Sequence, residues 1–274
     1  MPLRKLVLIH VAFHPPVQEV GRLRVSLSGL PPEIGYGVVV NDYRPGEPVE
    51  QLRKKADFFL GIQQNLGYGR AINRALSMID ESVPYLAALN TDLEWDPGTF
   101  EKILEWLDRN PETVLAVPQI VDSKGKIQLL CKRDPTILAL LSRRFIPSWL
   151  KPKWLLLYDS SYVMESSGYA CPVACSRRGE ARGDCMDVPY LSGCCMVFRA
   201  QALRGVGGFD ERYFLYLEDA DITRKLRRIG RCVHLHFANI YHRWGRGSYR
   251  NGWLALVNLH SAWVYFQKWG WRLW

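Results

Sequence analysis

Short, uninterrupted apolar runs recur through the first half of the chain and alternate with segments of helical spacing. Helical patterns occur at 69–79 and 99–110. The apolar runs are Leu6–Phe13, Gly37–Val40, Asp57–Ile62, Tyr85–Leu89 and Val114–Val117. Continuous apolar strands are typical of parallel strands that are buried on both faces, and their alternation with helices indicates the α/β class. We therefore predict a mostly parallel central sheet flanked by helices.

Polar residues end two of these runs. Asn41 and Asp42 follow the second run, and the stretch "NTDLE" follows the run that ends at Leu89. Ligands of such sheets bind outside the carboxyl ends of the strands. Asp92 and Glu94 would point the same way on an extended segment, and two carboxylates at that spacing suit a hard cation such as Mg²⁺ or Mn²⁺. The alternative interpretation is that these carboxylates are ordinary solvent-exposed residues at the edge of the sheet.

A second group of carboxylates opens a predicted amphipathic helix at 219–229. Glu218, Asp219 and Asp221 lie within one helical turn in "LEDAD". The helix dipole favours one or two acids at such a position without any function. The apolar lead-in "RYFLYL" would partly bury them, however, and a semi-buried carboxylate has a raised pKa and can act as a general base.

Two segments have the composition of an anion-binding site. His242 precedes Arg243 and Arg246 in "HRWGRGS", where guanidinium groups on a flexible backbone could cradle a pyrophosphate and the histidine could complete a metal shell. The stretch "QNLGYGRAINRAL" is rich in glycine and opens a helix. Neither a G-x-G-x-x-G nor a P-loop pattern occurs, which disfavours a dinucleotide-dependent dehydrogenase and a P-loop enzyme.

Composition narrows the classes of partner. The 274 residues carry a formal net charge of +9, which favours an anionic partner. No recognisable nucleic-acid module interleaves arginines with aromatic platforms, so we expect no nucleic acid. Seven irregularly spaced cysteines without a C-x-x-C pair predict reduced thiols in the cytoplasm rather than disulfides or zinc. Neither a signal peptide nor an apolar run of membrane-spanning length is visible.

Taken in order, these motifs resemble the nucleotide-sugar glycosyltransferases of family 2, which have a GT-A fold, and most closely the rhamnosyltransferase-like members that build bacterial surface polysaccharides. The resemblance covers roughly Leu6 to Tyr249. The segments that carry it are "VVVNDY", "NLGYGRAIN", "ALNTD", "LSGCCMVFRAQALRGVGGFDERYFLYLEDADITRKL" and "HRWGRGS". Thr91 stands where the family commonly has proline, and Asn41 precedes Asp42 where the family has its base-binding acid.

The resemblance implies roles for the matching positions. Asp219 would be the catalytic base, with Glu218 beside it. Asp92 would bind the metal, with His242 near the metal and the diphosphate, whereas Glu94 has no fixed counterpart in the family. The nucleotide would be bound by Asn41, Asp42, Asn65, Gly67 and Arg70.

The implied activity is an inverting single displacement that depends on Mg²⁺ or Mn²⁺. The expected donor is dTDP-rhamnose, with UDP- and GDP-sugars as alternatives, and the expected acceptor is a glycan or a lipid-linked glycan. A catalytically inactive module that binds nucleotide or glycan is the second hypothesis.

We expect a GT-A domain over 1–250, with nucleotide binding at about 1–95 and acceptor binding at about 96–250. Acceptor choice is expected in the weakly patterned region from Lys132 to Asp187. The tryptophan-rich segment 251–274 is expected to be a helix. It could lie on the inner face of the cell membrane, or it could pack on the catalytic domain or a dimer partner.

Overall fold

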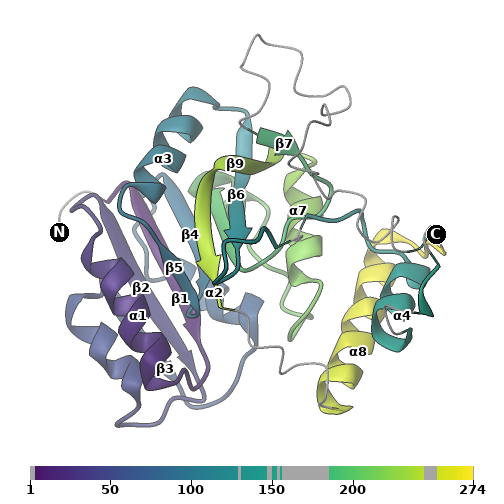
Figure 1. Cartoon of the computed structure of the whole chain (residues 1–274), viewed down its shortest axis with the longest axis horizontal. Coiled ribbons are helices and arrows are strands. Elements are labelled where there is room, and N and C mark those ends of the chain that lie inside the picture. The colour runs from purple at the N-terminus through teal and green to yellow at the C-terminus, as the bar shows by residue number, and fades with distance from the viewer. Residues whose placement is uncertain are drawn as a thin grey trace.

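A single nine-stranded sheet organises the molecule (Figure 1). The computed structural model describes residues 4–128, 131–146, 150–152, 155, 185–243 and 252–273. The strand order is β3-β2-β1-β4-β8-β6-β9-β5, and β7 also pairs with β9. The strands of the first half are β1 (Leu6–Ala12), β2 (Ile34–Asn41), β3 (Phe58–Ile62) and β4 (Tyr85–Asn90). Those that follow are β5 (Leu93–Trp95), β6 (Thr113–Val121), β7 (Cys185–Asp187), β8 (Cys195–Arg199) and β9 (Arg231–His242).

The two halves of the sheet differ in strand direction. Strands β1 to β4 pair only in parallel with one another, as the apolar runs predict. In the other half, β8 lies antiparallel between β4 and β6, β6 and β9 are parallel, and β5 and β7 run antiparallel to β9. The predicted α/β fold with a central sheet flanked by helices is confirmed, and its wholly parallel part is the N-terminal half.

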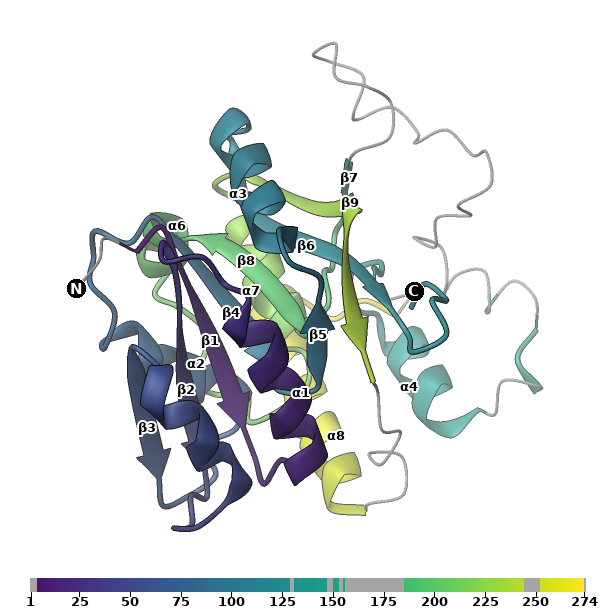
Figure 2. The same cartoon turned by 60° about the vertical axis from the view of Figure 1, so that its left-hand side comes forward.

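Helices cover both faces of the sheet (Figure 2). Alternate residues of β1 point to opposite faces, so Leu6 and Leu8 pack in one core cluster and Val7 and Ile9 in another. The first face is covered by α1 (Val17–Ser28), the 3₁₀ helix η1 (Pro48–Lys55) and α3 (Thr99–Arg109). The second is covered by α2 (Tyr68–Leu76), α6 (Ala200–Gly205) and α7 (Glu218–Leu226).

Two further helices pack together beside α7 (Figure 1). They are α4 (Ile137–Phe145) and α8 (Gly252–Trp269). The first backbone amides of α4 are bonded to the chain that follows α8, from Ile137 N to Arg272 O at 2.9 Å and from Leu138 N to Leu273 O at 3.1 Å. Val264 of α8 is buried in a third core cluster that includes residues of α7 and of the chain before it. No helix in the described ranges is long and apolar enough to cross a membrane.

The predicted elements lie close to the observed ones. The helix expected at 69–79 spans 68–76, and the one expected at 219–229 starts at Glu218 and ends at Leu226. Pattern analysis missed α1, η1, α4 and β5. In α1, the buried residues Val20, Leu23 and Leu27 stand three and four apart, which is a helical signal that the sequence does contain.

Candidate active site

Asp92 and His242 are brought together by the short antiparallel ladder between β5 and β9. Leu93 pairs with His242 in this ladder, and the Arg243 amide donates to the Asp92 carbonyl at 3.3 Å. The Asp92 side chain consequently meets the imidazole, with Oδ2 3.1 Å from Nε2 of His242. The register of a three-residue strand thus joins two segments that are far apart in the sequence.

Gln128 orients the His242 ring. Its Nε2 donates to the His242 carbonyl at 2.9 Å, which fixes which end of the amide is the oxygen, and its Oε1 lies 3.1 Å from His242 Nδ1. A carboxamide oxygen can only accept, so the hydrogen of the neutral ring belongs on Nδ1. In this neutral form the lone pair of Nε2 faces Asp92, as in metal-binding histidines, whereas a protonated ring would donate from Nε2 to Asp92 Oδ2.

The Asp92–His242 pair fits a divalent cation. Asp92 Oδ1 is buried and has no hydrogen-bond partner among the described residues, and Oδ2 lies 3.1 Å from Nε2 of His242. Two acceptors at this distance are stabilised by a cation between or beside them. No third His, Cys, Asp or Glu completes a metal-binding group within the described ranges. The remaining coordination positions of a hard cation would go to diphosphate oxygens and water.

Glu94 lies among arginines. Its Oε1 is 3.0 Å from Nε of Arg22 on α1 and 2.6 Å from Nε of Arg243. Its role as a metal ligand stays a prediction, as does a diphosphate contact for Arg243, whose guanidinium is held by Glu94 in this structure. Arg246 lies outside the described residues.

Glu19 lies near the Asp92–His242 pair, and the sequence pattern did not indicate it. It projects from α1, and Thr91 Oγ1 donates to its Oε1 at 2.5 Å. Burial raises the pKa of the Glu19 carboxyl, and the charge of Asp92 adds to this effect. Thr91 therefore supplies a hydroxyl that ties α1 to the end of β4.

Asp219 is held at the first turn of α7 by three donors. Tyr190 donates its hydroxyl to Oδ1 at 3.1 Å, the Ala220 amide donates to Oδ1 at 2.9 Å, and the Gly193 amide donates to Oδ2 at 3.0 Å. Burial raises the pKa of Asp219, while the charge of Lys132 and these hydrogen bonds oppose the rise. A side chain at position 193 would meet the Asp219 Cβ at 3.1 Å, so glycine permits this close approach.

Glu218 is more deeply isolated than Asp219. Its Oε2 is buried without a hydrogen-bond partner among the described residues. Burial raises the pKa of Glu218 to about 8, and the charge of Asp219 adds to the rise. Two adjacent carboxyls that resist ionisation together are a recurrent feature of acid–base sites.

We expect Glu218→Gln to remove part of the pH dependence of stability. Because the folded-state pKa lies above the ordinary value of 4.5, the folded protein binds more protons than the unfolded chain between about pH 4.5 and 8. Wild-type stability should fall as the pH rises through this window, and the variant should lose less. Melting temperatures at several pH values test this, and parallel curves for the two proteins would contradict it.

The Asp92–His242 pair and Asp219 are connected through the turn that includes Gly193 and Cys194. The buried Cys194 thiol has its pKa raised to about 12, mainly by burial, and the charges of Asp92 and Asp219 both contribute. The Asn90 amide at the end of β4 donates to the Cys194 carbonyl at 3.0 Å. The turn that includes Gly193 and Cys194 thus contacts Asp219 through the Gly193 amide and the end of β4, two residues before Asp92, through the Cys194 carbonyl.

Asn41, Asn65 and Gly67 build the turn that opens α2. The Asn41 side chain donates from Nδ2 to the Gly67 carbonyl at 3.0 Å and accepts at Oδ1 from the Leu66 backbone amide at 3.1 Å. The Asn65 side chain accepts at Oδ1 from the Gly67 backbone amide at 2.9 Å. Gly67 has a φ of +81°, and a Cβ there would lie 1.9 Å from the Phe214 carbonyl oxygen. These residues position the turn against the segment before α7, and their nucleotide contacts stay predictions.

Arg70 is bonded to that same segment, with Nε donating to the Glu211 carbonyl at 2.6 Å. Its predicted contact with the nucleotide is untested.

Asp42 lies in a charged cluster at the carboxyl ends of β1 and β2. His14 Nε2 is 2.9 Å from Asp42 Oδ2, His14 Nδ1 is 2.5 Å from Glu47, and Arg44 also contacts Asp42. His14 and Asp42 both have positive φ angles, which are uncommon for residues other than glycine. The hydrogen bond that His14 donates to the Asp42 carboxylate is the main cause that raises the pKa of His14. Sequence analysis did not single out His14.

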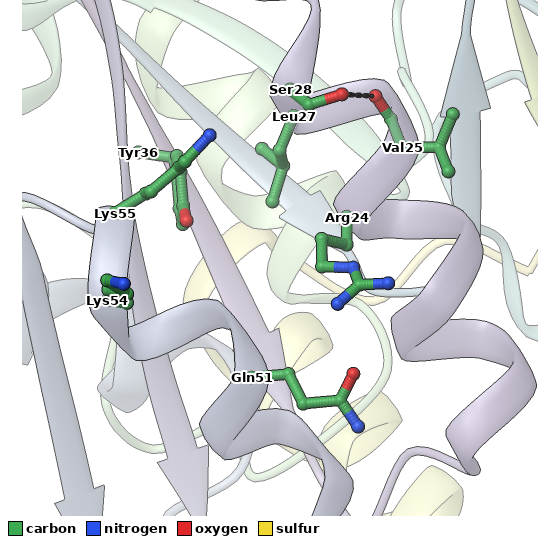
Figure 3. A pocket seen from close by; sticks show the side chains of 8 residues that line it. All are labelled: Arg24, Val25, Leu27, Ser28, Tyr36, Gln51, Lys54 and Lys55. Carbon is green, nitrogen blue, oxygen red and sulfur yellow. Dashed lines mark hydrogen bonds between the residues drawn. The ribbon is translucent and has the colours of Figure 1, made fainter.

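A separate pocket of about 470 Å³ lies between α1 and η1 (Figure 3). Its lining includes the cationic side chains Arg24, Lys54 and Lys55 beside Tyr36. No carboxylate or histidine lines it, and Tyr36 lies near the amino end of β2, whereas Asp42 follows its carboxyl end. This pocket is therefore distinct from the candidate active site.

Comparison with known proteins agrees with this geometry. Residues 37–207, more than half of the chain, match the family Glycosyl transferase family 2. The chain therefore belongs to glycosyl transferase family 2. The match ends before Asp219 and His242, so the geometry rather than the family match places these two residues in the site.

Two curated relatives, from two strains of Mycobacterium tuberculosis (CDC 1551 / Oshkosh and ATCC 25618 / H37Rv), are named N-acetylglucosaminyl-diphospho-decaprenol L-rhamnosyltransferase. Each is 26% identical over 225 residues, which cover 73% of this chain. The chain spans 66% of the length of these relatives.

Solved structures show that the fold is shared. The S. aureus protein TarS, residues 1–349, superposes with a TM-score of 0.56 at 17% identity, over 87% of this chain and 60% of that one. GalNAc-T7, determined with UDP, GalNAc and Mn²⁺, gives a TM-score of 0.60 at 12% identity, over 89% of this chain and 44% of that one. These likenesses establish a GT-A glycosyltransferase architecture.

Proposed function

We propose that this protein is a metal-dependent, inverting glycosyltransferase that uses a nucleotide diphosphate sugar. The observation that carries the proposal is that one turn contacts both groups: its Gly193 amide binds the Asp219 carboxylate, and its Cys194 carbonyl binds the Asn90 amide just before the Asp92–His242 pair. One group is suited to hold a cation and its diphosphate, and the other is a buried carboxylate suited to accept a proton. A binding module without catalytic activity would not need the second group.

In this proposal each residue has a separate task. Asp92 and His242 hold Mg²⁺ or Mn²⁺, which would neutralise the charge that develops on the departing diphosphate. Asp219 accepts the proton of the acceptor hydroxyl as that oxygen attacks the anomeric carbon. Tyr190 and the Gly193 amide keep the carboxylate in place. Because the displacement occurs in one step, no side chain is needed as a covalent nucleophile.

The finer substrate assignment follows the curated relatives. Their name describes transfer of L-rhamnose to a sugar carried on diphospho-decaprenol. We propose dTDP-rhamnose as the donor and a glycan or lipid-linked glycan as the acceptor, in bacterial surface polysaccharide synthesis. Asp42 and its neighbours at the ends of β1 and β2 are the proposed contacts of the nucleobase.

The donor proposal is tested by melting the protein with dTDP, UDP and GDP, each with and without Mn²⁺ or Mg²⁺. A ligand that binds only the folded state raises the melting temperature. We expect the largest rise with dTDP and metal together, followed by rhamnose transfer from dTDP-rhamnose in the same buffer. A rise with nucleotide but no transfer from any sugar donor would favour the inactive binding module.

We further propose that the protein acts at the inner face of the cell membrane through α8. One side of this helix is buried, whereas Trp253, Leu256, Leu259 and Trp263 on its other side are exposed, by 64%, 61%, 46% and 53%. The formal net charge of +9 favours an anionic surface. Exposed tryptophan on one side of a helix suits the interface of such a lipid bilayer.

The double substitution Trp253→Gln and Trp263→Gln should weaken binding to phosphatidylglycerol vesicles at least about tenfold, because each aromatic ring loses apolar area to bury. Co-sedimentation with the vesicles measures this. Val25→Gln is the control, since Val25 is 70% exposed and lies on α1. Equal sedimentation of the wild type and the double variant would count against membrane contact through α8.

A further inference from the structure

The buried carboxylate Asp221 joins the C-terminal helix to the helix that carries Asp219. Asp221 is fully buried on α7. Lys268 Nζ lies 2.8 Å from its Oδ2, and the Trp269 indole nitrogen donates to its Oδ1 at 2.7 Å. Two residues span about 200° around a helix, so Asp221 faces α8 while Asp219 faces the turn at Gly193.

The chain immediately before α7 is strained and is also held by α8. Tyr216 and Leu217 have φ angles of +70° and +63°, which are unfavourable for bulky residues and persist only where the surroundings impose them. The Ser261 hydroxyl of α8 donates to the Leu215 carbonyl at 2.8 Å. The contact with α8 therefore lies directly before the strained residues that lead into Glu218.

Further contacts make this junction extensive. The guanidinium groups of Arg224 on α7 and of Arg228, two residues beyond its end, lie 4.7 and 4.5 Å from the Trp269 ring centroid. Lys268 also pairs with Asp210 at 2.8 Å, on the segment that leads to α7. One cation of α8 thus holds both Asp210, before the strained turn, and Asp221, after it.

We propose that α8 is a positioning element for the acceptor-activating carboxylate, and that Lys268 and Trp269 are its positioning residues. This inference rests on the proposed function of Asp219. Without Lys268, the buried charge of Asp221 loses its ion-pair partner, which is strongly unfavourable. We therefore expect the first turn of α7 to move. Asp92 and His242 should keep their positions, because the ladder between β5 and β9 holds them.

The test compares Lys268→Met with Lys268→Arg and with Gln267→Met, a matched control at an exposed neighbouring position. For Lys268→Met we expect kcat for sugar transfer to fall about 10- to 100-fold, the scale of a catalytic group misplaced by about 1 Å. The KM for the donor and the stabilisation by nucleotide and metal should change less than twofold. Lys268→Arg should restore most of kcat, and Gln267→Met should behave as the wild type.

Hydrogen exchange of the peptide that covers 215–226 gives a readout that does not need activity. We expect faster exchange in Lys268→Met and Trp269→Phe and no change in Gln267→Met. Unchanged exchange with unchanged kcat would overturn the positioning role, and so would a parallel loss of kcat and nucleotide binding, which indicates general unfolding. If the wild type transfers no sugar while Lys268→Met still exchanges faster than the wild type, the contact between α7 and α8 stands and the proposed activity is rejected.

Discussion

Asp219→Asn is expected to lower kcat for sugar transfer by about 10²- to 10⁴-fold, the range that a positioned general base contributes. The amide keeps the size of the side chain and can still accept hydrogen bonds from Tyr190 and Gly193 through its oxygen, but it cannot take the acceptor proton. Steady-state kinetics with a nucleotide sugar donor and a glycan acceptor measure the effect.

Donor binding provides the control for this variant. Asp219 contacts neither Asp92 nor His242 in the hydrogen bonds described, so nucleotide and metal should stabilise Asp219→Asn as they stabilise the wild type. Residual transfer within about threefold of wild type would remove Asp219 from the role of base. Glu218→Gln is the useful comparison, because a larger loss in that variant would move the proton-accepting role to Glu218.

The pH profile adds an independent expectation. Burial raises the pKa of Asp219, and only the ionised carboxylate can accept a proton. Transfer should therefore increase with pH and lose rate on the acidic side at a pH above the ordinary range of an aspartate. A rate that is independent of pH down to the ordinary pKa of aspartate would contradict a buried base.

Asp92→Asn is expected to abolish the metal-dependent part of nucleotide binding and to lower kcat/KM by at least about 10²-fold, the scale of removing one group that stabilises developing charge. The variant replaces one carboxylate oxygen with an amide nitrogen, which cannot coordinate a cation. Melting curves with nucleotide diphosphate, in the presence of Mn²⁺ or of a chelator, measure the binding part.

Asp96→Asn is the matched control for the metal site. Asp96 follows β5, and its carboxylate accepts from the Tyr241 hydroxyl of β9 at 3.1 Å without a contact to His242. It should keep the metal-dependent shift. In the wild type, a chelator should remove the shift and added Mn²⁺ should restore it. If the wild type transfers sugar at its full rate in the presence of a chelator, and Asp92→Asn is equally active, the reaction does not need the cation.

The parallel half of the fold was readable from the sequence because its strands are buried on both faces. Such strands are continuous apolar runs with clear ends, as at Tyr85–Asn90. The short strand Leu93–Trp95 has no such signature, since three residues carry too little periodicity. The pairing of β5 with β9, which brings Asp92 to His242, therefore depends on tertiary structure and could not be predicted from local sequence.

Among the site residues, too, some could be predicted from the sequence and others could not. Asp92, Asp219 and His242 could be selected because each terminates or opens an element that the pattern reveals. The partners that define their environment could not be selected: Gln128, Glu19 and Tyr190 approach from distant segments. Likewise, the arginine neighbours of Glu94 include Arg22 on α1, a helix that the pattern analysis missed.

The β5–β9 ladder also has a consequence for the order in which the protein matures. Asp92 leaves the ribosome long before His242, and β8, which separates β4 from β6, is also made late. Contacts between such distant segments are slow to form because their loop closure costs entropy before any pairing offsets it. The Asp92–His242 pair can therefore form only after β9, the last strand of the sheet in the sequence, has been synthesised.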